Sequence, residues 1–187
     1  CDQMYLFEPG DDTTVCVLKA VKPKKVKLFT GPPSHKEDDA KVVHELMNNA
    51  DIRIVSGGTT SQIVARELGV EVKSSTEIYD KEVPPIAYIQ GVDLVTEGVL
   101  TLSKTIDRLK SLSKSLDSDI FKAKDGASQM AKLLYSASHI KLLVGRSLNI
   151  ANAESSFQRD LELRLHVVGE LEKILVKLGK IVTVEYY

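Results

Sequence analysis

The sequence has no apolar run approaching the roughly 18 to 20 residues that a membrane-spanning helix requires. It also lacks an excess of either charge, because 25 Lys and Arg stand against 26 Asp and Glu, for a net charge of −1. A balanced chain has no overall attraction for nucleic acid or for an anionic membrane surface. We therefore expect a cytoplasmic protein that binds neither nucleic acid nor membrane.

Cysteine is scarce, and the signatures of several common enzyme sites are missing. Cys1 and Cys16 are too few for a disulfide framework in a chain of 187 residues. Neither of them, and none of the four histidines, has a second Cys or His at metal-ligand spacing. The sequence contains no Gly-x-Ser-x-Gly turn, no Walker phosphate loop and no three-glycine dinucleotide motif. These absences exclude the usual patterns of zinc proteins, serine hydrolases and P-loop enzymes.

What the sequence does contain is a regular alternation of two patterns. Hydrophobic residues make up 43% and charged residues 27%, a mixture typical of folded domains. Short β-branched and apolar segments predict strands at residues 13–18, 26–30, 52–55, 70–72, 86–89, 140–144 and 181–186. Apolar residues at steps of three and four predict helices at residues 38–47, 60–68, 98–110, 127–137 and 161–178. The polar residues 111–124 are expected to form a connection.

This alternation predicts an α/β fold with an open, largely parallel sheet and helices on both faces, a Rossmann-like three-layer sandwich. A charged stretch around Pro23 interrupts the pattern and is typical of a linker. We place a domain boundary there, which divides the chain into residues 1–22 and an α/β domain of residues 23–187.

The best candidate binding site is the turn after the second strand of this domain, which reads Ser56, Gly57, Gly58, Thr59, Thr60. Glycines let the backbone approach a ligand closely, and the start of the following helix offers free N–H groups that favour a phosphate or carboxylate. Thr hydroxyls add further donors. The alternative is an ordinary strand-to-helix turn that is capped by a threonine and binds nothing.

Two charged residues, one after another predicted strand and one at a predicted helix start, are added to this site. In an open parallel sheet the carboxyl ends of the strands lie on one edge, where ligands bind at a switch in strand order. Arg146 offers a bidentate fork for a phosphate or carboxylate, and Glu97 offers an acceptor for a ribose-like hydroxyl or a metal. Each of them, taken alone, is more often a solvated or capping residue.

An acidic turn near the start, Glu8-Pro9-Gly10-Asp11-Asp12-Thr13-Thr14-Val15, precedes a predicted apolar strand. The segment resembles the last motif of the bacterial metal-dependent serine/threonine protein phosphatases of the stage II sporulation protein E type. The resemblance implies that Asp11 is one ligand of a pair of manganese or magnesium ions in the intact phosphatase. An ordinary turn that caps a strand is the alternative.

The stretches 56–66, 91–98 and 144–149 resemble an α/β segment that follows the phosphatase domain in some sporulation-type proteins. The two resemblances together imply that Cys1 lies inside a longer polypeptide and that residues 1–22 are the terminal strand of its phosphatase domain. The remaining chain is then an accessory domain that regulates the phosphatase, binds a small anionic ligand or a partner, and is not catalytic by itself. The alternatives are a self-standing enzyme acting on a phosphorylated metabolite and a pure interaction module, and a homodimer is compatible with each.

Overall fold

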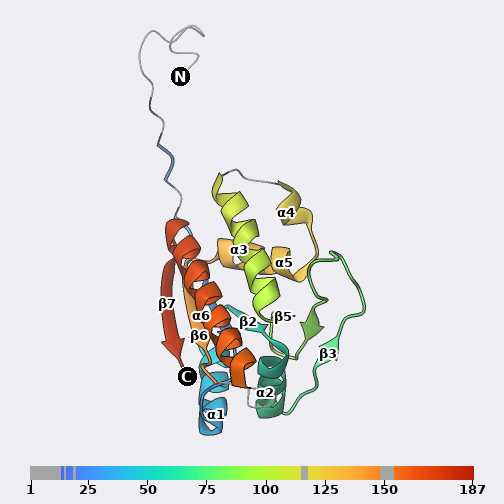
Figure 1. Cartoon of the computed structure of the whole chain (residues 1–187). Helices are drawn as coiled ribbons and strands as arrows, with labels where there is room; N and C mark the ends of the chain where they lie inside the picture. The colour runs from blue at the N-terminus through green and yellow to red at the C-terminus, as the bar shows by residue number, and fades with distance from the viewer. Residues whose placement is uncertain (1–13, 15, 19, 115–117, 148–153) are drawn as a thin grey trace, which may run out of the picture.

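The computed structural model describes residues 14, 16–18, 20–114, 118–147 and 154–187. From Lys25 onward they build a seven-stranded sheet with helices packed on it (Figure 1). The strands are β1 (Lys25–Thr30), β2 (Ile52–Ser56), β3 (Lys73–Ser74), β4 (Ala87–Tyr88), β5 (Leu94–Thr96), β6 (His139–Val144) and β7 (Ile181–Tyr186). The helices are α1 (Asp39–Met47), α2 (Gly58–Leu68), α3 (Val99–Lys114), α4 (Ser118–Lys122), α5 (Gly126–Ser136) and α6 (Glu154–Lys177), with a 3-10 turn η1 (Lys36–Asp38) before α1.

The sheet is open and mostly parallel, with the strand order β3-β4-β5-β2-β1-β6-β7. The five strands from β5 to β7 in this order run parallel to one another, whereas β4 pairs antiparallel with β5 and β3 antiparallel with β4. The predicted α/β fold with a largely parallel sheet is confirmed.

Two hydrophobic cores cover the two faces of the sheet because successive side chains of a strand point to opposite sides. On one face, Leu28 and Leu142 pack with apolar residues of α3, α5 and α6. On the other face, Phe29 and Val55 pack with residues of α1 and α2. Burial of one such side chain stabilises the fold by about 1.5–3 kcal/mol. The molecule is therefore the expected three-layer sandwich.

The order in which strands are added to the sheet reverses between β1 and β6. The chain first builds β1, β2 and β5 outward on one side, and then crosses back to add β6 and β7 on the other side of β1. The helix that follows β1 packs on one face, and α6, which follows β6, packs on the opposite face. In open α/β sheets the carboxyl ends of the strands near such a switch are where ligands bind.

Hydrogen bonds join the carboxyl ends of β1, β6 and β7 to one another. The N–H of Gly145 donates to the carbonyl of Thr30 at 2.9 Å, and the N–H of Arg146 donates to the carbonyl of Tyr187, also at 2.9 Å. The backbones touch so closely that a Cβ on Gly145 would lie 2.1 Å from the carbonyl oxygen of Pro32. Free space at this edge of the sheet therefore lies on the side of β1 that faces β2 and β5.

Several predicted boundaries differ from the structure. The strand β5 was not predicted, the strand expected at 70–72 is the two-residue β3 at Lys73–Ser74, and the connection expected at 111–124 contains the end of α3 and the whole of α4. The described residues of the expected strand 13–18 are outside any strand, and Val17 and Leu18 are 84% and 94% exposed. Cys16, which belongs to the same segment, is also exposed. A strand requires a hydrogen-bonded neighbour, and no described strand pairs with this segment.

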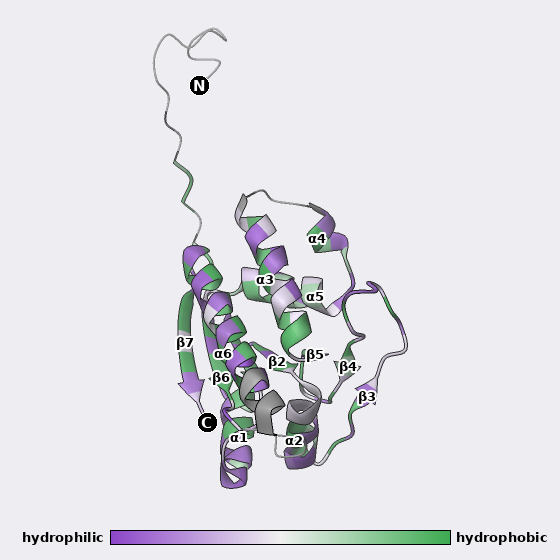
Figure 2. Ribbon diagram, in the orientation of Figure 1, coloured by the Kyte–Doolittle hydropathy of each residue, from purple (hydrophilic) through white to green (hydrophobic). Residues whose placement is uncertain are grey.

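Figure 2 shows β7 as a mostly hydrophobic strand at one edge of the sheet. Its Val182 and Val184 pack against the core beneath α6, while Ile181 on the opposite face is exposed. Within the described parts of the chain, no helix combines the length and the apolar character needed to cross a membrane.

Candidate functional site

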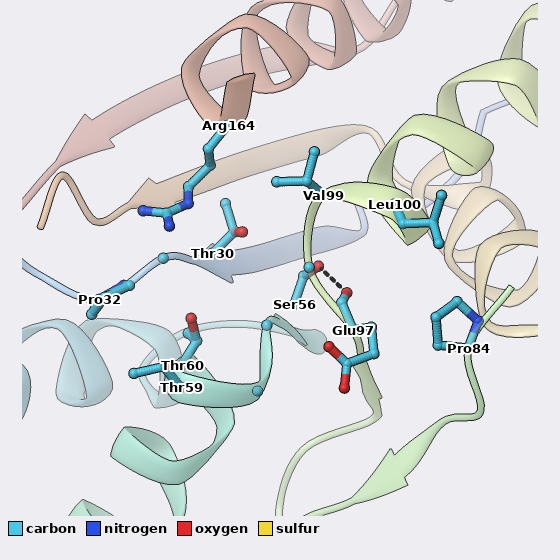
Figure 3. A pocket seen from close by; sticks show the side chains of 14 residues that line it. Thr30, Pro32, Ser56, Thr59, Thr60, Pro84, Glu97, Val99, Leu100 and Arg164 are labelled. Carbon is cyan, nitrogen blue, oxygen red and sulfur yellow. Dashed lines mark hydrogen bonds between the residues drawn. The ribbon is translucent and has the colours of Figure 1, made fainter. Parts of the chain in front are cut away.

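A cleft of about 570 Å³ opens at the carboxyl edge of the sheet (Figure 3). Its size falls in the range of about 300–1,000 Å³ that is typical of small-molecule sites. Its walls come from the loops after β1, β2 and β5, from the starts of α2 and α3, from the loop before β4, and from α6. The lining residues are Thr30, Gly31, Pro32, Ser56, Gly57, Gly58, Thr59, Thr60, Pro84, Glu97, Gly98, Val99, Leu100 and Arg164.

The floor of the cleft contains the N-terminus of α2. The N-cap residue Gly57 has a φ of +124°, a conformation that favours glycine, and it provides no side chain to cap the helix. The first amide of the helix with a described backbone partner is that of Ser61, which donates to the carbonyl of Gly57 at 2.8 Å. The preceding N–H groups of the first turn carry the partial positive charge of the helix and are available to an anion.

The cation of the cleft is Arg164, which reaches over from α6 (Figure 3). Its Nη1 donates to the carbonyl oxygen of Gly145 at 3.3 Å, and it forms no ion pair with any residue that the structure describes. Burial lowers the pKa of its guanidinium, and the negative charge of Asp160 opposes this effect in part. A partly buried cation without a carboxylate partner is poorly compensated, so an anion in the cleft would stabilise it.

The position of Arg164 depends on Gly31 in the loop after β1. Gly31 has a φ of +78°, and a Cβ built on it would lie 2.6 Å from Nη1 of Arg164. The absence of a side chain at residue 31 therefore lets the guanidinium lie directly against the loop that follows β1.

Two buried threonines present hydroxyls to the cleft. Thr30 ends β1 and Thr60 lies in the first turn of α2, and each is 1% exposed. Neither hydroxyl forms a hydrogen bond with another described residue. Figure 3 shows Thr30 between Arg164 and Ser56, and Oγ1 of Thr60 lies beside the N-cap residue Gly57. Both hydroxyls can therefore donate to, or accept from, a polar group in the cleft.

Ser56 connects two of the loops that line the cleft. Its buried hydroxyl donates to the backbone carbonyl of Glu97 at 2.8 Å (Figure 3). The N–H of Gly57 also donates to the carbonyl of Thr96 at 2.9 Å. Ser56 therefore joins the loop after β2 to the loop after β5 and lines the cleft without offering it a free donor.

Glu97 is an exposed side chain on the Pro84 side of the cleft, across from Arg164 (Figure 3). It follows β5 directly, so its backbone is fixed by the bond from Ser56 while its carboxylate is left to the cleft. Asp93, the other acidic residue near this loop, does not line the cleft, because its Oδ2 accepts the N–H of Arg53 at 2.7 Å.

The structure brings most of the predicted site residues together. Ser56, Gly57, Gly58, Thr59, Thr60 and Glu97 all line the cleft. Arg146 does not, because the loop after β6 is bonded to the end of β7 and the guanidinium of Arg146 lies 5.5 Å from the centre of the Tyr186 ring. Asp11, and with it the expected manganese or magnesium site, lies outside the described residues.

Sequence reasoning missed Arg164, although the sequence contains a signal for it. Leu161, Leu165 and Val168 define the apolar stripe of α6, and Arg164 lies three residues after the first and four before the last of them. An isolated arginine on the buried stripe of a helix either pairs with another group of the protein or faces a binding site.

Fold and cleft together define a doubly wound α/β domain with a cleft of small-molecule size at the carboxyl edge of its sheet. Comparison with models of protein families, with curated proteins and with solved structures finds no match for this chain.

Proposed function

We propose that the domain of residues 23–187 binds a small phosphate-bearing anion in the cleft at the carboxyl edge of its sheet. The observation that carries the proposal is Arg164, a partly buried cation that faces the cleft without an ion-pair partner among the described residues. The uncapped start of α2 and the unpartnered hydroxyls of Thr30 and Thr60 surround the same space. A planar guanidinium and free backbone N–H groups are the donors that phosphate oxygens require.

The resemblance noted in the sequence supplies the wider context of the proposal. On that basis the domain is an accessory domain of a sporulation-type serine/threonine phosphatase in the cytoplasm, its partner is the phosphatase domain of the same polypeptide, and the bound anion regulates that domain. The exposure of Val17 and Leu18 supports this assignment, because apolar side chains of this kind are suited to packing against another domain. The cleft itself then binds and does not catalyse.

The test compares thermal unfolding of the chain in sodium phosphate and in sodium chloride at equal ionic strength. A ligand at one hundred times its Kd stabilises the folded state by about 2.7 kcal/mol. We expect a phosphate-dependent rise in Tm for the wild type and for Arg146→Met, and its loss in Arg164→Met. The two variants remove the same charge at neighbouring places, but only Arg164 lines the cleft.

Equal phosphate effects on wild type and Arg164→Met, or no effect on either, contradict the proposal. Release of inorganic phosphate from a sugar phosphate by the purified chain would favour the self-standing enzyme instead. In that case Glu97, the lining carboxylate, becomes the candidate acid or base.

A further inference from the structure

The charges that line the cleft are few and unlike. Among its described lining residues Arg164 is the one cationic side chain and Glu97 the one carboxylate. They come from different elements, α6 and the loop after β5, and Figure 3 shows them on opposite sides of the cleft. The two ends of the cleft therefore differ in charge. We call the end with Arg164 the anion-binding end and the end with Glu97 the acceptor end.

The positive charge at the anion-binding end is enough to balance one phosphate group. Arg164 and the partial positive charge at the start of α2 compensate the negative charge of one phosphomonoester. The hydroxyls of Thr30 and Thr60 add neutral hydrogen-bond donors. A triphosphate would bring further negative charges into a cleft that has no second cation among its described residues and that contains Glu97. Its desolvation would be uncompensated.

The acceptor end requires a donor from the ligand. An ionised carboxylate only accepts hydrogen bonds, so Glu97 repels a second anion and pairs with a hydroxyl. Pro84, Val99 and Leu100 form an apolar wall beside it, and Leu100 is 52% exposed. A carbon skeleton that carries hydroxyl groups would cover this wall and reach Glu97 at the same time.

The size of the cleft agrees with a ligand of two parts. A volume of about 570 Å³ far exceeds what a single inorganic phosphate fills. We infer that the natural ligand is a monophosphorylated polyol, such as a sugar phosphate, with its phosphate between Arg164 and the start of α2 and a hydroxyl on Glu97. This inference rests on the proposed function, since it adds a second recognition element to the same cleft.

The experiment measures affinities of the full chain for ribose 5-phosphate, inorganic phosphate and tripolyphosphate by isothermal titration calorimetry at constant ionic strength. We expect ribose 5-phosphate to bind at least about tenfold more tightly than inorganic phosphate, since a hydrogen bond to a charged group adds about that much. Tripolyphosphate should bind no better than inorganic phosphate. Glu97→Gln should weaken ribose 5-phosphate and, by removing a like charge, strengthen inorganic phosphate.

Glu71→Gln is the matched control, because Glu71 is an exposed carboxylate in another part of the surface and does not line the cleft. It should leave all three affinities unchanged. If inorganic phosphate binds through Arg164 but the preference for ribose 5-phosphate is absent, or survives Glu97→Gln undiminished, the inference of a polyol ligand is wrong and the phosphate site stands. Tightest binding of tripolyphosphate overturns it in the same way. If none of the three binds, the proposed function fails together with the inference.

Discussion

Gly31 and Arg164 form the contact on which the proposed anion-binding end of the cleft depends. The loop residue adopts a φ of +78°, and its missing side chain leaves the space that the guanidinium occupies. Two independent costs are thus attached to a side chain at residue 31: backbone strain, and a clash with the group that is proposed to hold phosphate.

Gly31→Ala is therefore expected to lower the free energy of unfolding by about 1–3 kcal/mol and to weaken phosphate binding. Urea denaturation measures the first effect and a phosphate titration the second. Gly69→Ala is the matched control, because Gly69 has a similar φ of +67° but open space around its Cβ position. The control should lose stability through strain and keep its phosphate affinity. Unchanged phosphate binding in Gly31→Ala would show that Arg164 does not need this space.

At the scale of elements, the long and strongly periodic segments could be predicted from the sequence and the short ones could not. The last helix and strand were predicted because many apolar residues repeat at one period. The strand β5 was missed because Leu94–Thr96 has three residues, too few for a pattern, and gains its structure from pairing with β2. The position of β5 in the sheet depends on pairing between segments far apart in the sequence, and a local sequence pattern does not reveal such pairing.

The same limit explains the site. The turn from Ser56 to Thr60 is local, so its glycines and threonines could be recognised in the sequence. Arg164 reaches the cleft because α6 packs on the sheet with Arg164 beside the loops after β1 and β6, and the N–H of Arg146 is bonded to the carbonyl of Tyr187. Both facts depend on how distant elements pack.

A network of ionic hydrogen bonds connects α1 to three strands on the face opposite α6. Glu45 accepts from Lys27 at 2.6 Å and from Lys141 at 2.8 Å, and Glu185 accepts from Lys141 at 2.6 Å. The bonds from Lys141 and then Lys27 lower the pKa of Glu45, and those from Lys141 and then Tyr187 lower the pKa of Glu185. Both carboxylates therefore stabilise the fold in their ionised form.

Because these pKa values are lower in the folded state than in the unfolded chain, their contribution is present above the unfolded pKa of about 4.3 and is lost as pH falls through the folded values. Denaturant melts between about pH 5 and pH 3 should show a falling free energy of unfolding. Replacing both carboxylates, Glu45→Gln with Glu185→Gln, should reduce that fall by about 1 kcal/mol or less, since the pairs are partly exposed and screened. Glu71→Gln should retain the wild-type slope, and an equally steep slope in the double variant would count against the network.

For the whole molecule, the described structure begins to pack only near Lys24. The N–H of Lys24 donates to Oγ of Ser138 at 2.8 Å, whereas the described residues before it are exposed. The sheet, both cores and the cleft lie entirely within residues 24–187.

Removal of residues 1–22 should therefore leave the Tm and the phosphate response unchanged. Differential scanning calorimetry of the shortened and full chains, with and without phosphate, measures both quantities. A marked drop in Tm would mean that the first segment contributes to this domain, and the boundary at Pro23 would be wrong. Removal of residues 1–27 also deletes the buried start of β1 and should prevent folding, so it serves as the comparison for the shorter deletion.

The close contact between the loops after β1 and β6 also bears on how such a domain can diversify. Gly31 and Gly145 have almost no freedom to change, because a methyl group at either would meet backbone or guanidinium atoms. Glu97 and Leu100, on the far side of the same cleft, are exposed and carry little of the core. Substitutions would therefore be tolerated at the Glu97 end of the cleft and disfavoured at the Gly31 end, so that ligand preference can change while the proposed phosphate contact is kept.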